Sequence, residues 1–433
     1  MYFFGKTLFN IIIKVMKKKI YIFYFFILLL TPWILEVLVV NLKSNLQPKS
    51  LPLPFEKSLQ IYNERNEKIS FFLKNNYSPM YYVNAGLEYA DYYLNLLNKH
   101  EFIPVGSFPN KKSYFCDEGY GFISFETDHL GLRNPKEEWS KNYPYNTLII
   151  GDSYIHGACV GNNKDISSIL RRNGRQVLNL GLGDNQAIQY YHLIEKFTKP
   201  KPPKNLVVAF YGGNDFHNSK YKDFYLNLQK NEGISFSKKN GLHVLGNNAV
   251  KFYDELNYIN SLEVENYLKK KGNKNQNEKS EVVENELANF KSIILLRNIR
   301  NILKLKYSIE ISKGLLCYQG RCLIGSIEEG VFGDVTLVIS SLIKHCNPTN
   351  NCNPIVAFIP SSTLWKPQKI HETRKKEFDK ILSNIIEENN FLIYYDSSKH
   401  IDKNNLKNYA PAGGHFSEEA YELFAKNLEK YLK

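Results

Sequence analysis

Three residues that could serve acyl transfer each follow a short apolar run of the chain. Ser153 stands in LIIGDS, Gly183 ends QVLNLGLG, and Asn214 stands in NLVVAFYGGND. A serine hydroxyl becomes a nucleophile once a base removes its proton. The backbone N–H groups of a serine and a glycine, together with an asparagine amide, are donors that could hold the oxyanion of a tetrahedral intermediate. These residue types therefore indicate acyl transfer, provided that the fold brings them together.

The segments that carry these residues recur in a regular rhythm. Apolar runs ending in glycine lie about 30 residues apart, at 148–151, 176–183 and 205–215, which is typical of βαβ units and a parallel sheet. Because the carboxyl ends of parallel strands share one edge, we expect Ser153, Gly183 and Asn214 to converge there. The same periodicity predicts helices over 165–172, 185–198, 333–345, 368–389 and 417–432, and further strands over 354–362 and 391–398.

Four short blocks, taken in order, resemble the SGNH, or GDSL, hydrolase family. They are Gly151-Asp152-Ser153, Gly183, Gly213-Asn214-Asp215 and the late His415 in PAGGHFSEEAY. TDHLGLRNP, which precedes the first block, resembles a stretch of membrane-anchored bacterial members. The resemblance covers about 125–433, apart from an insertion at about 217–330. It implies an α/β fold, a flavodoxin-like three-layer α/β/α sandwich with a parallel sheet. It also implies Ser153 as nucleophile, His415 as base, and Ser153, Gly183 and Asn214 as oxyanion donors.

The chain departs from the family pattern at one position. The family usually has an aspartate three residues before the histidine, where it orients the imidazole, and Ala412 stands there in this chain. In a Ser-His-Asp protease, loss of the acid that orients the imidazole lowers the turnover number of the enzyme about 10⁴-fold. The substitutes we consider are a backbone carbonyl near Ala412, Asp396 at the end of the last expected strand, and Asp402. The departure also keeps open a non-catalytic protein that binds glycan or acts as a scaffold.

Several neighbours of these blocks have alternative interpretations. His156 is close to Ser153 in sequence but lies in the turn after it, so we interpret it as structural or pocket-lining. Asp152 is expected to fix the turn by accepting hydrogen bonds from backbone amides. His217 and Asp215, at the third block, are expected at the rim in contact with substrate. The alternative for Ser153 itself is a helix N-cap, because Asp and Ser are good caps after a strand.

The N-terminus has the pattern of a membrane anchor. A lysine cluster at 14–19 precedes residues 20–40, which are apolar apart from Glu36 near their far end and are long enough to span a bilayer as a helix. The positive-inside rule puts the N-terminus in the cytoplasm and the bulk of the chain outside the inner membrane. A cleaved signal peptide is the rival, but Thr31-Pro32-Trp33 is a poor cleavage site. The expected order is a cytoplasmic segment at 1–19, the transmembrane helix at 20–40, a linker and helical or irregular lead-in at 41–145, and the hydrolase-like domain at 146–433.

The six cysteines suit an oxidising compartment. Two close pairs, Cys317 with Cys322 and Cys346 with Cys352, could each close a small loop through a disulfide. Free thiols, and pairing between the two pairs, are the alternatives. A zinc site made from both pairs is disfavoured, because the usual spacing of two residues between paired ligands is absent. We therefore expect disulfides and no metal.

Composition and motifs narrow the function further. The net charge of +13 comes from lysines spread along the chain, and no nucleic-acid-binding motif accompanies it, so we expect no nucleic-acid partner. No phosphate-binding loop or complete dinucleotide motif occurs, and we expect no cofactor. The resemblance leads us to expect a serine esterase that acts on O-acyl, most simply O-acetyl, groups of an acylated envelope glycan or lipid. An O-acyltransferase on the same scaffold is the alternative. The sequence does not indicate an oligomeric state.

Overall fold

The structure of the chain is a computed structural model, and the chain divides into two compact units. The larger unit comprises Ser50–Leu268 and Ile327–Lys433, and the smaller one Met1–Lys49 and Lys269–Ser326. The residues that the structure describes are 31, 71–80, 91–141, 145–199, 201–216, 219, 221–231, 236–239, 242–272, 317–318, 321–322, 332–361, 368–411 and 413–433. All of the blocks discussed above that are described belong to the larger unit.

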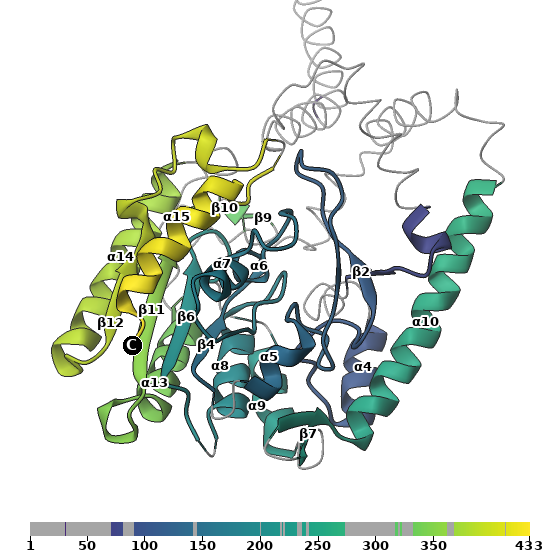
Figure 1. Cartoon of the computed structure of the whole chain (residues 1–433), viewed down its shortest axis with the longest axis horizontal. Coiled ribbons are helices and arrows are strands. Elements are labelled where there is room, and N and C mark those ends of the chain that lie inside the picture. The colour runs from purple at the N-terminus through teal and green to yellow at the C-terminus, as the bar shows by residue number, and fades with distance from the viewer. Residues whose placement is uncertain are drawn as a thin grey trace, which may run out of the picture. The chain divides into compact units, whose positions relative to one another are not determined.

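Five parallel strands form the central sheet of the larger unit, in the order β12-β11-β6-β4-β5 (Figure 1). The strands are β4 (Thr147–Ile150), β5 (Val177–Asn179), β6 (Asn205–Tyr211), β11 (Asn353–Ile359) and β12 (Ile393–Asp396). The predicted parallel sheet is therefore confirmed. The strand order reverses at β4, so the carboxyl ends of β4 and β6 flank the point at which such sheets form their ligand crevices.

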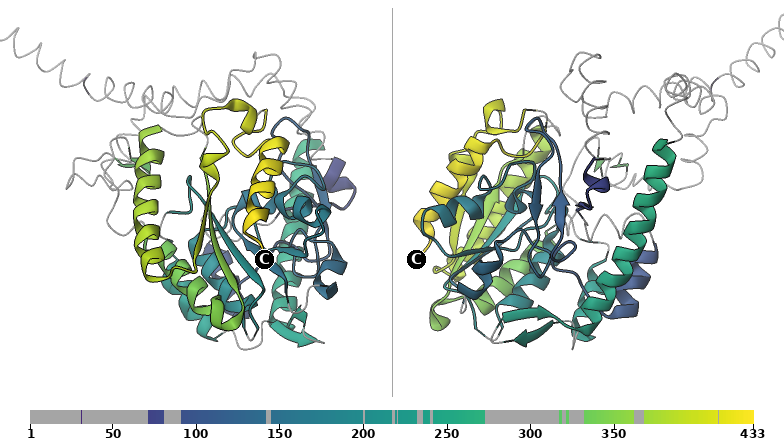
Figure 2. Two further views of the ribbon diagram at one scale, coloured as in Figure 1. Left: turned by 60° about the vertical axis from the view of Figure 1, so that its left-hand side comes forward. Right: turned by 45° about the vertical axis from the view of Figure 1, so that its right-hand side comes forward.

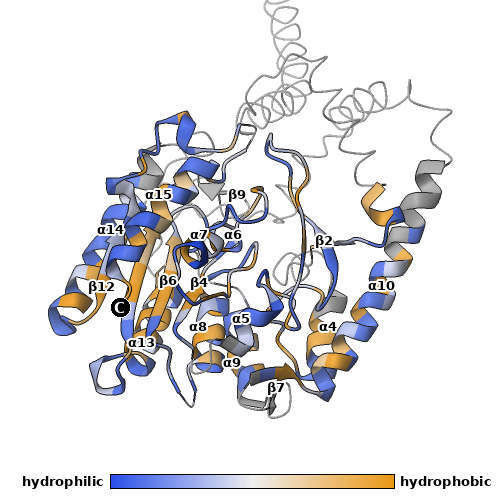
Figure 3. Cartoon of the chain, viewed as in Figure 1, coloured by the Kyte–Doolittle hydropathy of each residue, from blue (hydrophilic) through white to orange (hydrophobic). Residues whose placement is uncertain are grey.

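Helices cover both faces of this sheet, because successive strand residues point to opposite sides and are apolar on each (Figure 2). Leu148 and Val208 face one hydrophobic core, and Ile149 and Val207 face the other. Figure 3 shows the strands as largely hydrophobic between helices that carry hydrophilic residues. The first core includes residues of α8 (Ala187–Phe197), α13 (Gly333–His345) and α14 (Gln368–Glu388), and the second includes residues of α7 (Ile166–Arg172) and α15 (Glu418–Leu428).

A smaller sheet precedes the central one along the chain and packs on the same domain. It consists of β1 (Ser78–Pro79), β2 (Lys112–Tyr114) and β3 (Ser124–Glu126), of which β2 and β3 form an antiparallel hairpin. Its core takes in residues of α4 (Asp91–His100), α9 (Lys222–Asn231) and α10 (Asn247–Gly272). The same core contains Cys159 and Leu182 from the turns above the central sheet. The described lead-in residues and the central domain therefore share a hydrophobic core.

The other described elements are short. In the smaller unit, β9 (Cys317–Tyr318) and β10 (Arg321–Cys322) pair antiparallel, with the backbones of Cys317 and Cys322 opposite each other. The predicted bond between the sulfurs of this pair lies outside what the structure describes. The larger unit adds α5 (Lys136–Lys141), α6 (Ser153–His156), the hairpin of β7 (Phe236–Lys239) and β8 (Leu242–Leu245), and the 3-10 helices η3 (Pro348–Asn350), η4 (Ser397–Lys399), η5 (Leu406–Asn408) and η6 (Glu429–Tyr431).

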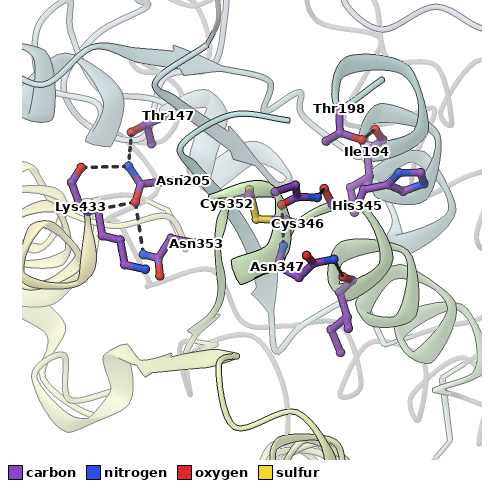
Figure 4. The surroundings of a disulfide bond; sticks show 12 residues. Thr147, Ile194, Thr198, Asn205, His345, Cys346, Asn347, Cys352, Asn353 and Lys433 are labelled. Atoms are coloured by element: carbon purple, nitrogen blue, oxygen red, sulfur yellow. Dashed lines mark hydrogen bonds between the residues drawn. A yellow bond between two sulfur atoms is a disulfide. The ribbon is translucent and has the colours of Figure 1, made fainter. Parts of the chain in front are cut away.

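The sequence predicted a membrane span and a disulfide, and the structure describes only the second of them. The membrane span predicted over 20–40 lies outside the described residues except for Thr31. Among the residues that are described, no helix has the length and apolar character needed to cross a membrane. The predicted disulfide between Cys346 and Cys352 is confirmed. It joins the end of α13 to the residue before β11, at the amino edge of the sheet (Figure 4).

A buried asparagine ties the amino ends of three strands together. Asn205 Nδ2 donates to Thr147 Oγ1 at 3.1 Å and to the carbonyl oxygen of Lys433 at 3.3 Å. Its Oδ1 accepts hydrogen bonds from Asn353 Nδ2 at 3.2 Å and from the backbone N–H of Lys433 at 2.9 Å (Figure 4). One fully buried side chain thus fixes β4, β6, β11 and the C-terminus at the edge opposite to the turns that carry Ser153 and Asn214.

We predict that Asn205→Ala lowers the free energy of unfolding by about 1–3 kcal/mol, because it leaves several buried polar groups without partners. Urea denaturation measures the change. The control is Asn390→Ala, an exposed position in a turn, for which we expect a change within about 0.5 kcal/mol. Equal unfolding midpoints for the two variants would contradict the structural role of Asn205.

Candidate active site

The turn after β4 presents Ser153 at the carboxyl edge of the sheet. Asp152 caps α6, since its Oδ1 accepts a hydrogen bond from the backbone N–H of Tyr154 at 2.9 Å. Gly151 precedes it because a Cβ there would lie 2.3 Å from Ile155 Cγ1. The cap of the helix is therefore Asp152, in the structural role that we predicted for it. Ser153 is the first residue of α6, and its half-buried side chain has another partner.

That partner is His415, at the other end of the chain. His415 Nε2 lies 2.8 Å from Ser153 Oγ. The loop that carries His415 is held by Tyr154, whose hydroxyl donates to the carbonyl oxygen of Gly414 at 2.7 Å. The next residue, Phe416, is fully buried in the core beneath α15. The residue after the serine and the residue after the histidine thus both fix the Ser153–His415 contact.

The other ring nitrogen of His415 contacts a glutamate that the sequence did not reveal. Glu118 Oε1 lies 2.8 Å from His415 Nδ1, and Oε2 accepts a hydrogen bond from the backbone N–H of His415 at 3.1 Å. Glu118 belongs to the loop between β2 and β3, in the run FCDEGYGF. Asp117 shapes that loop, because its Oδ1 accepts hydrogen bonds from the N–H groups of Gly119 and Gly121. Ser153, His415 and Glu118 therefore form a continuous chain of contacts.

The electrostatics of this contact favour a carboxylate on Glu118. Burial by itself raises the pKa of the Glu118 carboxyl, but the hydrogen bonds and charge of His415 outweigh burial, and the net pKa is lowered. A carboxylate that accepts from both the ring and the backbone of His415 fixes the orientation of the imidazole. It also selects the tautomer with the proton on Nδ1, which leaves Nε2 free to accept a proton from Ser153.

The acids that we considered for this role have other partners. Asp396 Oδ2 accepts a hydrogen bond from Lys375 Nζ at 2.9 Å, and its Oδ1 accepts from the backbone N–H of Ser398. Asp402 Oδ1 accepts from the backbone N–H of Asn404 at 2.9 Å. Glu118 contacts His415 Nδ1 in place of Asp396 or Asp402. The remaining option was a backbone carbonyl near Ala412, and Ala412 itself lies outside the described residues.

The expected oxyanion donors follow neighbouring strands. β4 lies between β5 and β6, so the turns with Ser153, Gly183 and Asn214 meet at one edge. The N–H of Leu182 donates to the carbonyl oxygen of Gly151 at 3.3 Å, which links the first two turns directly. Among the described residues, none accepts a hydrogen bond from the N–H of Ser153 or of Gly183. Those two donors are therefore available to a ligand.

Asp215 has a structural environment and not the rim position that we expected. It is fully buried, and its Oδ2 accepts hydrogen bonds from the Tyr190 hydroxyl at 2.8 Å and from the backbone N–H of Tyr211 at 2.7 Å. Burial, with the nearby charge of Asp152, raises the pKa of Asp215 well above its ordinary value. A side chain enclosed in this way fixes the turn. His217 lies outside the described residues.

His156 is also enclosed, as its interpretation as a structural residue requires. It is 1% exposed, and its ring lies against the rings of Phe115 and Phe125. Burial lowers the pKa of His156 to about 3, so the imidazole is neutral. The histidine in contact with Ser153 Oγ is His415, although His156 is much closer to Ser153 in sequence.

A disulfide that we did not predict borders the site. Cys116 is bonded to Cys159, and Cys159 Sγ lies 3.7 Å from His415 Nδ1. Glu118, Cys159 and His415 offer ligand atoms within 4.8 Å of one another, a grouping that can hold a metal ion. The sulfur, however, already forms a disulfide with Cys116, and the ring nitrogen and the carboxylate are hydrogen-bonded to each other. These atoms therefore suit an acid–base relay better than a metal site.

A cavity opens beside the third block. It has a volume of about 400 Å³, and its walls come from the carboxyl ends of β6 and β11 and from α14. Its lining combines charged side chains, among them Lys375, Asp402 and Lys403, with apolar surface that includes Phe358 and Ile401. Such mixed walls suit a ligand that has both polar and apolar parts.

Comparison of the chain with protein-family models, with curated proteins and with solved structures finds no match. Its function therefore has to be inferred from the geometry of its own residues.

We predict that Gly413→Ala separates Glu118 from His415. A Cβ at position 413 would lie 1.8 Å from Glu118 Cδ and 2.1 Å from Cγ, so the glutamate would have to move. We expect the rate at which a fluorophosphonate labels Ser153 to fall tenfold or more, with little change in the melting temperature. Gly161→Ala is the control, because a Cβ there meets nothing within 4 Å. Equal labelling rates in the two variants would show that the site tolerates displacement of Glu118.

We predict that Asp152→Asn stabilises the protein at pH 7 and not at pH 4. Burial raises the pKa of Asp152 from 3.8 to about 6, so above pH 6 the folded state bears an unfavourable buried charge. Stability from this group is therefore greatest at low pH and declines as the pH rises towards 6. A neutral asparagine, which can still cap α6, should gain up to about 3 kcal/mol at pH 7. Urea unfolding at both pH values measures it, and a gain independent of pH would contradict the assignment.

Proposed function

We propose that the chain is a serine esterase of the SGNH type that removes O-acyl groups, most simply O-acetyl groups, from an envelope glycan or lipid. The observation that carries the proposal is the pair of 2.8 Å contacts that join Ser153 Oγ to His415 Nε2 and His415 Nδ1 to Glu118 Oε1. A serine hydroxyl, an imidazole and a carboxylate in this order are the parts that nucleophilic acyl transfer needs.

The proposed reaction follows from the positions of these atoms. Ser153 Oγ attacks the ester carbonyl while His415 Nε2 takes its proton, and the protonated imidazole then gives the proton to the leaving alcohol. Glu118 holds the Nδ1–H and stabilises the imidazolium. The negative oxygen of the tetrahedral intermediate is stabilised by hydrogen bonds from the N–H groups of Ser153 and Gly183 and from the amide of Asn214. Water then releases the acyl group from Ser153 by the same steps.

The fold and the cysteines support the wider setting of the proposal. Counted along the chain, the strand order of the central sheet is 2-1-3-4-5, the order of flavodoxin-like sheets, and helices lie on both faces. The disulfides Cys116–Cys159 and Cys346–Cys352 favour an oxidising compartment. With the apolar segment at 20–40 as its anchor, the enzyme would act outside the cytoplasmic membrane. The cavity beside the third block, with its charged and apolar lining, would accommodate an acylated sugar.

The non-catalytic alternative depended on Ala412 in place of an orienting aspartate. Glu118 provides a carboxylate at the nitrogen where that aspartate would act, from a segment 297 residues away in the chain. The reason to expect a non-catalytic site is therefore weaker than it was from the sequence alone.

We predict that a fluorophosphonate labels the wild-type protein at Ser153, and that Ser153→Ala abolishes the labelling. Glu118→Gln, which keeps the shape but removes the charge, should lower the rate of acetyl-ester hydrolysis by about 10²–10⁴-fold. Glu387→Gln, at an exposed position of α14, is the matched control and should keep the wild-type rate. Folded wild-type protein that is not labelled would overturn the proposal.

Product analysis in the same experiment separates hydrolysis from transfer. An acetyl-ester donor is incubated with the enzyme, with and without an oligosaccharide acceptor. Release of acetate that the acceptor does not change supports the hydrolase. Acetylation of the acceptor at the expense of acetate would instead support the O-acyltransferase, which uses the same Ser153, His415 and Glu118.

A further inference from the structure

The disulfide Cys116–Cys159 joins the two segments that must meet for the site to form. Cys116 stands two residues before Glu118, and Cys159 stands six residues after Ser153. The bond therefore links the loop of the acid to the loop of the nucleophile. Because Cys159 Sγ is 3.7 Å from His415 Nδ1, the covalent link lies next to the contact that it would maintain.

The loop that carries Glu118 contacts the central domain at its tip. Two hydrogen bonds to Asp117 Oδ1, from the N–H groups of Gly119 and Gly121, and one from Phe115 N–H to Ile123 O shape the hairpin of β2 and β3 from within. The described contacts of the tip include the disulfide, the contact of Glu118 with His415 and a hydrogen bond between Tyr120 and the backbone of Glu418.

The base of the hairpin is anchored separately. Phe115 and Phe125 pack on the ring of His156, and the guanidinium of Arg133 lies 4.7 Å from the centre of the Phe125 ring. Asn162 Nδ2 also donates to the carbonyl oxygen of Ser124. Loss of the disulfide should therefore free the tip with Glu118 while the hairpin stays docked.

We propose that the Cys116–Cys159 disulfide positions Glu118 against His415, so that the site is complete only when this bond is oxidised. The inference rests on the proposed function and adds a redox condition to it. Cys116 and Cys159 are positioning residues here, because neither sulfur takes part in acyl transfer.

The redox step needs a dithiol reductant. One thiolate of the reductant attacks the sulfur of the half-buried Cys116, since Cys159 is fully buried, and the bond between the two cysteines breaks. The second thiol of the reductant then displaces Cys116 from the mixed disulfide. The products are two cysteine thiols and the oxidised reductant, with two electrons and two protons transferred.

The second described disulfide is a built-in control. Cys346–Cys352 is also a disulfide, but it lies at the amino edge of the sheet, away from the carboxyl edge where Ser153 stands. Its removal should lower stability without affecting Glu118.

The experiment compares the pair of substitutions Cys116→Ser and Cys159→Ser with the pair Cys346→Ser and Cys352→Ser, each with and without Glu118→Gln. We expect the first pair to lower kcat for acetyl-ester hydrolysis at least tenfold with little change in KM, and Glu118→Gln to add nearly nothing to that loss. In the control pair, Glu118→Gln should keep its full effect. If the first pair keeps the wild-type kcat, or if Glu118→Gln costs as much in it as in the control, the positioning role is overturned.

A second readout does not depend on activity. The proton NMR signal of the His415 Nδ1–H should lie at low field in the oxidised protein, move upfield on treatment with dithiothreitol, and return on reoxidation. A shift that is the same in both states would overturn the inference while leaving the esterase proposal intact. A reversible shift in a protein whose Ser153 is never labelled would support the inference and overturn the esterase proposal.

Discussion

The hydrogen bond between His415 Nδ1 and Glu118 is the interaction on which the rest of the site depends. An imidazole accepts a proton at Nε2 only if its other nitrogen carries one, and a carboxylate at that nitrogen keeps it there. Glu118 also accepts from the backbone N–H of His415, so it fixes the loop as well as the ring. Without this double contact, Ser153 would have a neighbour but no oriented base.

The larger unit supports this contact from three directions. The carboxyl edge of the parallel sheet presents the turns of Ser153, Gly183 and Asn214. Tyr154 and Phe416 hold the loop of His415. The β2–β3 hairpin brings Glu118, and its core is continuous with the core beneath the turns. A region that looked like a lead-in to the domain is thus part of the site.

The turns around the nucleophile tolerate a cluster of buried acids. Asp152 caps α6 and Asp215 fixes the turn after β6, and burial raises the pKa of both carboxyls. Each makes at least one hydrogen bond to a backbone N–H, which holds the turn in shape. The structure therefore uses buried carboxyl groups as structural elements of these turns, beside Glu118, which contacts His415.

The sequence by itself determined the parallel sheet and the positions of the turns, and it favoured the pairing of Cys346 with Cys352 over free thiols or cross-pairing. These features depend on local periodicity and short spacing, which the chain displays directly. The tertiary structure decided the partner of His415, the enclosure of Asp215 and the Cys116–Cys159 bond. The physical reason is that Glu118 meets His415 across 297 residues through the packing of a hairpin on the domain. Asp396 and Asp402 are closer in sequence, but packing and not sequence distance decides which carboxylate reaches the ring.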